Sequence, residues 1–225
     1  MPTNPFLALM LAARAHAEAH GAPTPVLSPL DATLLGDASP VNVAQLHRAG
    51  FRVVPWTTND PATMRALIDL RVDGIITDRP DILQSVLKEE AAASPTDASY
   101  FAAFDVAAHR GGRGLRPENT LPAFEAGLDH LAPTLETDTG VTTDHVSLIG
   151  HDQFFNPESC RHTDGTPYTL ENRIYIRDIS SAKAQRTFIC DKLRAQFPDQ
   201  TNDLSLSPVS VAFAKQESLI SPYVP

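Results

Sequence analysis

Short runs of apolar residues alternate with helix-forming segments along much of the chain. Four such runs, at residues 51–56, 73–78, 104–109 and 146–150, lack the regular polar alternation of a half-exposed strand. A segment with helical periodicity, residues 61–72, separates the first two runs. Apolar strands joined by helices are typical of a parallel sheet that is covered on both faces. The pattern therefore predicts an α/β fold.

The charge balance limits the classes of partner that we expect. The 225 residues include 18 basic and 27 acidic side chains, which gives a formal net charge of −9. An acidic chain does not attract nucleic acid over a broad surface, so no nucleic-acid partner is predicted. An anionic small molecule would need a local positive site. No apolar run approaches the roughly 20 residues that a membrane-spanning helix needs, so no transmembrane segment is predicted.

Two features of the sequence bear on the cellular compartment in which the protein is located. The N-terminal segment has no basic residue before its short apolar centre, which argues against a secretory signal. It favours a helix with Asn4 as its cap and Pro5 in its first turn. Cys160 and Cys190 flank a polar segment, and we expect free thiols, with a disulfide as the alternative. This segment favours a periplasmic or secreted location over a cytoplasmic one.

Two side chains suited to phosphate chemistry follow one of the apolar runs. His109 ends that run and can donate or accept a proton near neutral pH. Arg110 presents a planar set of donors that matches phosphate oxygens. Gly111 and Gly112 would let backbone amides approach an anion closely. We therefore predict an anion site at the end of this strand.

Carboxylates and a second histidine follow the next runs. Glu136 and Asp138 are two residues apart on an expected strand, so both would point to one face and offer oxygen ligands to Mg²⁺ or Ca²⁺. His151 and Asp152 end the run after that. An isolated Glu-x-Asp pair is usually two surface acids, and a single histidine is usually structural. Together, at the carboxyl ends of successive strands, they indicate the active face of a βα barrel.

These residues form four motifs that resemble those of the glycerophosphodiester phosphodiesterase family. They are His-Arg-Gly at 109–111, Pro-Glu-Asn-Thr at 117–120, Glu-x-Asp at 136–138 and His-Asp at 151–152. Their identity, order and spacing agree together with the family. The resemblance implies a TIM-type barrel that hydrolyses glycerophosphodiesters to glycerol 3-phosphate and an alcohol.

The resemblance also implies a role for each motif residue. His109 and His151 would form the acid–base pair, and Arg110 would bind the phosphate of the substrate. Glu136 and Asp138 would hold the divalent cofactor, Mg²⁺ or Ca²⁺. Two further residues, Glu118 and Asp152, would support the site.

The N-terminal part of the chain resembles the end of such a barrel rather than its start. Residues 53–83 look like the last two strands. There Trp56 would contact the substrate and Asn59 would support the site at its mouth. The family's ending thus precedes its beginning, as in a circular permutation or at the junction of two tandem domains.

This order divides the chain into three parts. Residues 1–92 form a C-terminal-type barrel segment, residues 93–100 a linker, and residues 101–225 an N-terminal-type segment with an irregular polar insert from about residue 154. One helix, at 180–197, is expected in the insert. We place about six strands, against the eight of a closed barrel. A strand bearing a third acidic ligand is missing, and open strand edges would favour self-association.

The sequence is compatible with three functions. The leading hypothesis is a metal-dependent glycerophosphodiesterase. The alternative is an incomplete, non-catalytic barrel that binds phosphate or a partner chain. A phospholipase of the sphingomyelinase-D type also has paired histidines and an acidic metal site, but the Pro-Glu-Asn-Thr motif and the barrel-closing segment favour the first hypothesis over it.

Overall fold

The computed structural model describes residues 4–36 and 39–202. The chain divides into two compact units. The first unit consists of residues 1–77 and 81–107, and the second of residues 78–80 and 108–225. The division falls inside strand β2 (Asp105–His109).

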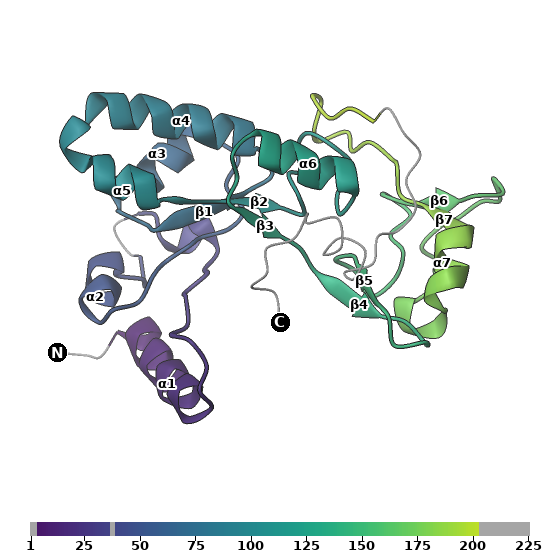
Figure 1. The fold of residues 1–225 in the computed structure, drawn as a ribbon, viewed down its shortest axis with the longest axis horizontal. Coiled ribbons are helices and arrows are strands. Elements are labelled where there is room, and N and C mark those ends of the chain that lie inside the picture. The colour runs from purple at the N-terminus through teal and green to yellow at the C-terminus, as the bar shows by residue number, and fades with distance from the viewer. Residues whose placement is uncertain (1–3, 37–38, 203–225) are drawn as a thin grey trace. The chain divides into compact units, whose positions relative to one another are not determined.

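The first unit is rich in helices, and Figure 1 labels them α1 to α5. Asn4 caps the first of them as expected, because its Oδ1 accepts hydrogen bonds from the backbone N–H groups of Phe6, at 2.9 Å, and Leu7, at 3.4 Å. Pro5 occupies the first turn, where no N–H is needed. The elements are α1 (Pro5–Ala19), η1 (Asp31–Thr33), α2 (Val43–Arg48), α3 (Pro61–Asp69), β1 (Gly74–Thr77), α4 (Pro80–Ala93), η2 (Pro95–Asp97) and α5 (Ala98–Ala103).

The strand expected at residues 51–56 is reduced to isolated parallel bridges. Leu27 pairs with Val53, and Leu30 pairs with Trp56. Proline interrupts both runs, at positions 29 and 55, and removes the N–H groups that a longer ladder requires. The core of this unit is nevertheless well filled, by fully buried side chains that include Leu46, Val53, Met64, Leu67, Val72, Ile75 and Leu83.

The segment expected as a linker, residues 93–100, is largely helical. It contains η2 and the first turn of α5. Tyr100 explains why it is ordered: its hydroxyl donates to the carbonyl of Val72 at 2.9 Å, and the guanidinium of Arg71 lies 4.8 Å from its ring centroid. Aromatic packing thus fixes a stretch whose composition resembles a loop.

Strand β2 lies between β1 and β3 (Thr134–Glu136) in a three-stranded sheet. The run at 146–150 does not extend this sheet, contrary to expectation. Its strand β5 (Ser147–Ile149) pairs antiparallel with β4 (Thr139–Val141). The turn between them explains the pairing, because Thr142 donates its N–H to the carbonyl of Val146 at 3.0 Å and closes a hairpin.

The second unit has a hydrophobic core where we expected an irregular polar insert. The rings of Phe155 and Phe188 stack at 4.2 Å between centroids, and the hydroxyl of Tyr168 donates to the carbonyl of Phe155 at 2.5 Å. These aromatic residues are widely and irregularly spaced, so they give no periodic signal in the sequence. The buried members of this core are Leu148, Phe155, Cys160, Tyr168, Ile176, Ile179, Ala184 and Phe188.

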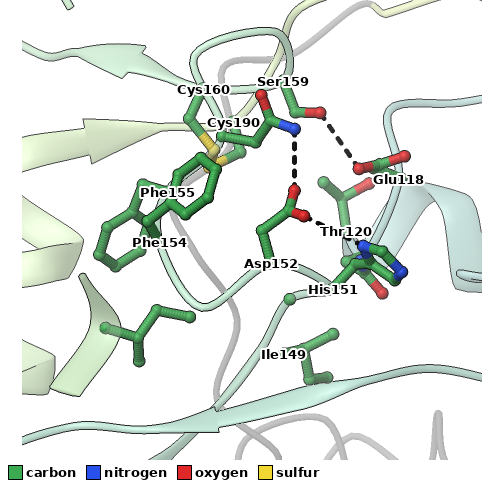
Figure 2. A pocket seen from close by; sticks show the side chains of 14 residues that line it. Glu118, Thr120, Ile149, His151, Asp152, Phe154, Phe155, Ser159, Cys160 and Cys190 are labelled. Atoms are coloured by element: carbon green, nitrogen blue, oxygen red, sulfur yellow. Dashed lines mark hydrogen bonds and ion pairs between the residues drawn. A yellow bond between two sulfur atoms is a disulfide. The ribbon is translucent and has the colours of Figure 1, made fainter. Parts of the chain in front are cut away.

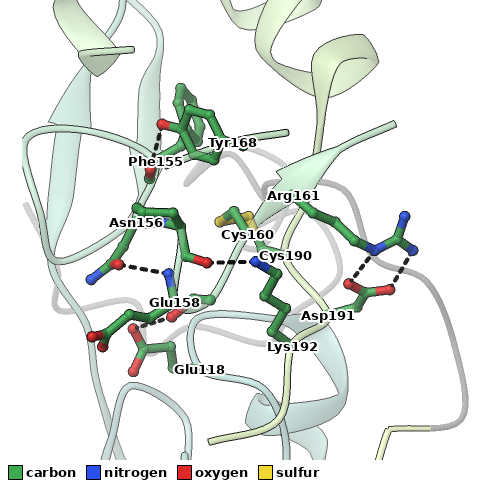
Figure 3. Close-up of a disulfide and its surroundings, with 12 residues drawn as sticks. Glu118, Phe155, Asn156, Glu158, Cys160, Arg161, Tyr168, Cys190, Asp191 and Lys192 are labelled. Carbon is green, nitrogen blue, oxygen red and sulfur yellow. Dashed lines mark hydrogen bonds and ion pairs between the residues drawn. A yellow bond between two sulfur atoms is a disulfide. The ribbon is translucent and has the colours of Figure 1, made fainter. Parts of the chain in front are cut away.

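The two cysteines are joined in a disulfide, so the expectation of free thiols was wrong (Figure 3). The bond closes what we call the disulfide loop, residues 160–190. Its ends pair as short antiparallel strands, β6 (Arg161–His162) and β7 (Phe188–Ile189). The helix expected at 180–197 is therefore only α7 (Ser181–Thr187), because Phe188 turns into the core and starts β7.

The remaining elements of the second unit are α6 (Leu121–Asp129) and η3 (Ile176–Asp178). None of the helices within residues 4–36 and 39–202 is long and apolar enough to cross a membrane.

Candidate active site

The loop after β2 has a backbone that few residues can adopt. Arg110, Gly111 and Gly112 have φ angles of 52°, 86° and 101°. A Cβ on Gly111 would lie 2.4 Å from Cδ1 of Phe124, so a side chain is excluded there on two grounds. This tight turn directs His109 toward the carboxylate of Asp78 and Arg110 toward that of Glu118.

His109 lies between two carboxylates. Its Nδ1 hydrogen-bonds Oδ1 of Asp78 at 2.6 Å, and its Nε2 lies 3.7 Å from Oε2 of Glu136. The Asp78 side chain is only 2% exposed. Burial raises the pKa of this carboxyl, but hydrogen bonds from His109 and Arg113 outweigh burial and hold the pKa below its ordinary value of 3.8. Asp78 is therefore an ionised acceptor at neutral pH.

Glu118 joins two arginines. Its Oε2 accepts a hydrogen bond from Nη1 of Arg110 at 3.0 Å and lies 3.5 Å from Nη1 of Arg113. Its Oε1 accepts from the hydroxyl of Ser159 at 3.1 Å. All of these side chains are buried or nearly so, which strengthens their electrostatic interaction and makes any loss of a partner costly.

The rest of the Pro-Glu-Asn-Thr motif shapes the same loop. Asn119 donates its backbone N–H to the carbonyl of Arg110 at 2.9 Å, and its Oδ1 accepts from Thr137 at 2.8 Å. Thr120 caps α6. The motif thus ties the β2 loop to the segment that follows β3, where the predicted metal ligands lie.

Glu136 and Asp138 both face Arg110. The backbone N–H of Arg110 donates to Oε2 of Glu136 at 3.3 Å, and its Nε lies 4.0 Å from Oδ2 of Asp138. That separation is too long for a hydrogen bond, and both atoms are buried without a hydrogen-bond partner among residues 4–36 and 39–202. Buried polar atoms without partners are rare and commonly mark the place of a ligand or ion.

The two carboxylates fit a divalent ion in chemistry and number. Mg²⁺ is commonly held by one or two protein carboxylates, with water and phosphate as its other ligands. The partnerless Oδ2 of Asp138 has the capacity to accept such an ion. Among residues 4–36 and 39–202, however, no group of three or more His, Cys, Asp or Glu side chains is arranged as a set of metal ligands.

His151 lies in a second part of the site, the pocket drawn in Figure 2. Its Nδ1 is 3.2 Å from Oδ1 of Asp152, whose Oδ2 accepts from Asn156 at 2.8 Å. The His151 side chain is 47% exposed, whereas that of His109 is 13% exposed. Further lining residues are Glu118, Thr120, Ile149, Phe154, Phe155 and the disulfide.

The structure therefore groups the predicted residues into two clusters. His109, Arg110, Glu136 and Asp138 form one, and His151 with Asp152 forms the other. Glu118 belongs to both, because it binds Arg110 and lines the pocket of His151.

Trp56 and Asn59 belong to the first compact unit. The Trp56 side chain is 45% exposed and donates its Nε1–H to the carbonyl of Ser28 at 3.0 Å. Asn59 Oδ1 accepts from the hydroxyl of Thr77 at 3.1 Å. Their predicted roles at the mouth of the site stay predictions.

Sequence reasoning missed Asp78, Arg113 and Ser159. Asp78 directly follows the apolar run of β1, so the rule that selected His109 could have selected it. Arg113 lies one turn beyond Arg110, in the same glycine-rich loop. Ser159 gives no signal, because it lies 41 positions from Glu118 in the sequence and meets it only in the folded chain.

Comparison with known proteins agrees with the motifs. The chain belongs to the glycerophosphoryl diester phosphodiesterase family, whose profile matches residues 8–82 and 109–216. Membership in this family implies a TIM-type barrel. The permuted order and the strand count remain predictions.

Individual relatives match shorter stretches. The chain is 49% identical over 49 residues to "Probable glycerophosphodiester phosphodiesterase 2" of Mycobacterium tuberculosis, covering 22% of this chain and 19% of the relative. It is 41% identical over 59 residues to "Lysophospholipase D GDPD3" of Mus musculus, covering 26% of this chain and 18% of the relative. The chain thus spans about a fifth of the length of either relative.

One solved structure is also similar. It is that of a protein named as a glycerophosphoryl diester phosphodiesterase from Silicibacter pomeroyi DSS-3. The match has 25% sequence identity and a TM-score of 0.46, and covers 53% of this chain and 41% of the other.

Proposed function

We propose that this chain carries the catalytic site of a glycerophosphodiesterase, which hydrolyses glycerophosphodiesters to glycerol 3-phosphate and an alcohol. One observation carries the proposal: the buried Nε of Arg110 has no hydrogen-bond partner among the described residues, and it lies 4.0 Å from Asp138. The backbone N–H of the same arginine donates to Glu136, which lies 3.7 Å from His109. A phosphoryl oxygen would satisfy this donor where a protein atom does not. The family and the name of the mycobacterial relative point to the same class of substrate.

The proposed proton transfers use the two histidines. His109 Nε2 takes the proton of the nucleophile, which is water or the neighbouring hydroxyl of the substrate's glycerol. Attack by water gives glycerol 3-phosphate directly, whereas attack by the hydroxyl gives a cyclic phosphate that a water molecule must then open to glycerol 3-phosphate. His151 protonates the departing alcohol from its exposed position in the pocket. Arg110 orients the phosphate and stabilises the negative charge that grows on its oxygens.

Glu136 and Asp138 would hold the divalent cofactor, Mg²⁺ or Ca²⁺. When bound, the ion would neutralise charge on the phosphate and lower the pKa of a bound water. Arg110 already contacts or faces both carboxylates. Within the described part of the chain, Oδ2 of Asp138 has no protein donor and is left to accept an ion.

The proposal also covers the order of the barrel segments. We interpret the chain as a permuted barrel or as the junction of two tandem domains, because the barrel-closing motif precedes the His-Arg-Gly motif. The disulfide between Cys160 and Cys190 supports an oxidising compartment, either periplasmic or extracellular.

The test is the release of glycerol 3-phosphate from glycerophosphocholine by the purified chain. The protein is first treated with a chelator and then supplied with Mg²⁺ or with Ca²⁺. Release that stops on chelation and returns with either ion supports the proposal. Folded, ion-supplemented protein that releases no glycerol 3-phosphate contradicts it.

A further inference from the structure

Asp78 hydrogen-bonds Nδ1 of His109, the ring nitrogen that faces away from Glu136. The Nδ1···Oδ1 distance is 2.6 Å, while Nε2 points toward Oε2 of Glu136 at 3.7 Å. An ionised carboxylate only accepts hydrogen bonds, so the neutral ring must carry its proton on Nδ1. The lone pair of Nε2 is then directed toward the side where Glu136 and Arg110 lie.

We propose that Asp78 is a positioning residue, which fixes the tautomer and the orientation of His109 so that Nε2 can accept a proton. The expected effect on kcat rests on the proposed function. The tautomer of His109 does not, because it can be measured in the protein without substrate. The arrangement follows the general design in which a base is oriented by a third group.

Asp78 is well placed for this role because it is itself held rigidly. Its Oδ1 also accepts from Nε of Arg113 at 2.6 Å, and its backbone carbonyl accepts from the N–H of Gly114 at 2.9 Å. A Cβ on Gly114 would lie 2.6 Å from that carbonyl oxygen, so only glycine permits the approach.

Arg113 is in turn fixed on several sides. Its guanidinium lies 5.4 Å from the ring centroid of Phe197 and close to Glu118, and its backbone carbonyl accepts from Gln200 at 2.7 Å. A network of hydrogen bonds thus runs from Glu118 through Arg113 and Asp78 to His109. Such buried, satisfied networks keep their members in one geometry.

The test measures the tautomer of His109 by ¹⁵N NMR of histidine-labelled protein, at a pH where the ring is neutral, together with kcat and KM. The wild type is expected to carry the proton on Nδ1. In Asp78→Ala the ring is expected to lose this tautomer, and kcat to fall about 10²- to 10⁴-fold with KM nearly unchanged. Asp78→Asn keeps an acceptor oxygen and is expected to recover part of both readouts.

Asp73→Asn is the matched control. Asp73 accepts from Nε2 of His47 at 2.9 Å and from the N–H of Val53 at 2.7 Å, outside the catalytic residues. This variant should leave the His109 tautomer and kcat unchanged.

The inference is overturned if neutral His109 in the wild type is protonated on Nε2, or if Asp78→Ala changes neither tautomer nor kcat. If Asp78→Ala does not fold, the wild-type spectrum and Asp78→Asn still decide the question. If the wild type releases no glycerol 3-phosphate, the proposed function fails, but the tautomer measurement decides the role of Asp78 independently.

Discussion

Ser159 donates a hydrogen bond to Oε1 of Glu118 at 3.1 Å, although 41 residues separate them. The other oxygen of Glu118 binds Arg110, the proposed phosphate ligand. Ser159 directly precedes Cys160 and hence the disulfide loop. The loop is therefore linked through one buried carboxylate to the arginine of the site.

Reduction of the disulfide should lower stability. A crosslink between residues 30 apart restricts the unfolded chain and contributes about 3.6 kcal/mol in the chain-entropy view. We expect Cys160→Ser/Cys190→Ser to unfold at lower urea concentration than the wild type and to respond no further to reductant. Equal urea midpoints for oxidised wild type and double variant would contradict the bonded state.

Removal of the Glu118 carboxylate should also be costly. Glu118→Ala leaves Arg110 and Arg113 without their shared partner, and breaking a buried ion pair typically costs about 3–5 kcal/mol. Urea denaturation measures the loss. Glu171→Ala is the control, because Glu171 is exposed and its carboxylate lies outside the site. Similar small losses in the free energy of unfolding for both variants would show that the contacts of Glu118 with the two arginines do not stabilise the fold.

Gly111 should tolerate no side chain. In Gly111→Ala the new Cβ would meet Phe124 as well as a strained φ of 86°. Gly165→Ala is the matched control, because its φ is 78° but nothing lies within 4 Å of the added Cβ. The control should lose about 1–2 kcal/mol from backbone strain alone, and Gly111→Ala clearly more. Equal losses in thermal or urea unfolding would contradict the close packing of the loop.

Acid should remove the stabilisation that Asp78 supplies. The pKa of Asp78 is lowered by folding, so its contribution is fully present above the ordinary value of 3.8 and is lost as the pH falls through the lower folded-state pKa. We expect the unfolding free energy to fall less steeply below pH 3.8 in Asp78→Asn than in the wild type. Parallel curves in that window would show that Asp78 binds its proton equally in both states.

The sequence predicted which polar residues lie together better than it predicted the strands around them. Polar groups at strand ends can be recognised locally, which singled out His109, Arg110, Glu136 and Asp138. The structure brings these four residues together, and their catalytic and metal-binding roles stay predictions. Asp78 was missed although it obeys the same rule, since a lone aspartate after a strand resembles an ordinary turn residue.

Other features depend on long-range packing that no local pattern encodes. The segment from about residue 154 looked polar and irregular because Phe155 and Phe188, whose rings stack in the core of the second unit, are 33 positions apart in the sequence. Strand β5 looked like a sheet strand, but the turn at Thr142 folds it back onto β4. Periodicity shows that a strand exists, whereas its partner depends on the turn that precedes it.

The most direct test of the proposed function compares the rate of glycerol 3-phosphate release by the wild type with that of His109→Ala, at saturating glycerophosphocholine and with Mg²⁺ or Ca²⁺ present. Loss of a general acid or base typically lowers the rate about 10²- to 10⁴-fold, and we predict a loss in this range. His47→Ala, which removes a histidine from the other compact unit, should stay near the wild-type rate. An undiminished rate in folded His109→Ala would contradict the proposed catalytic role of His109.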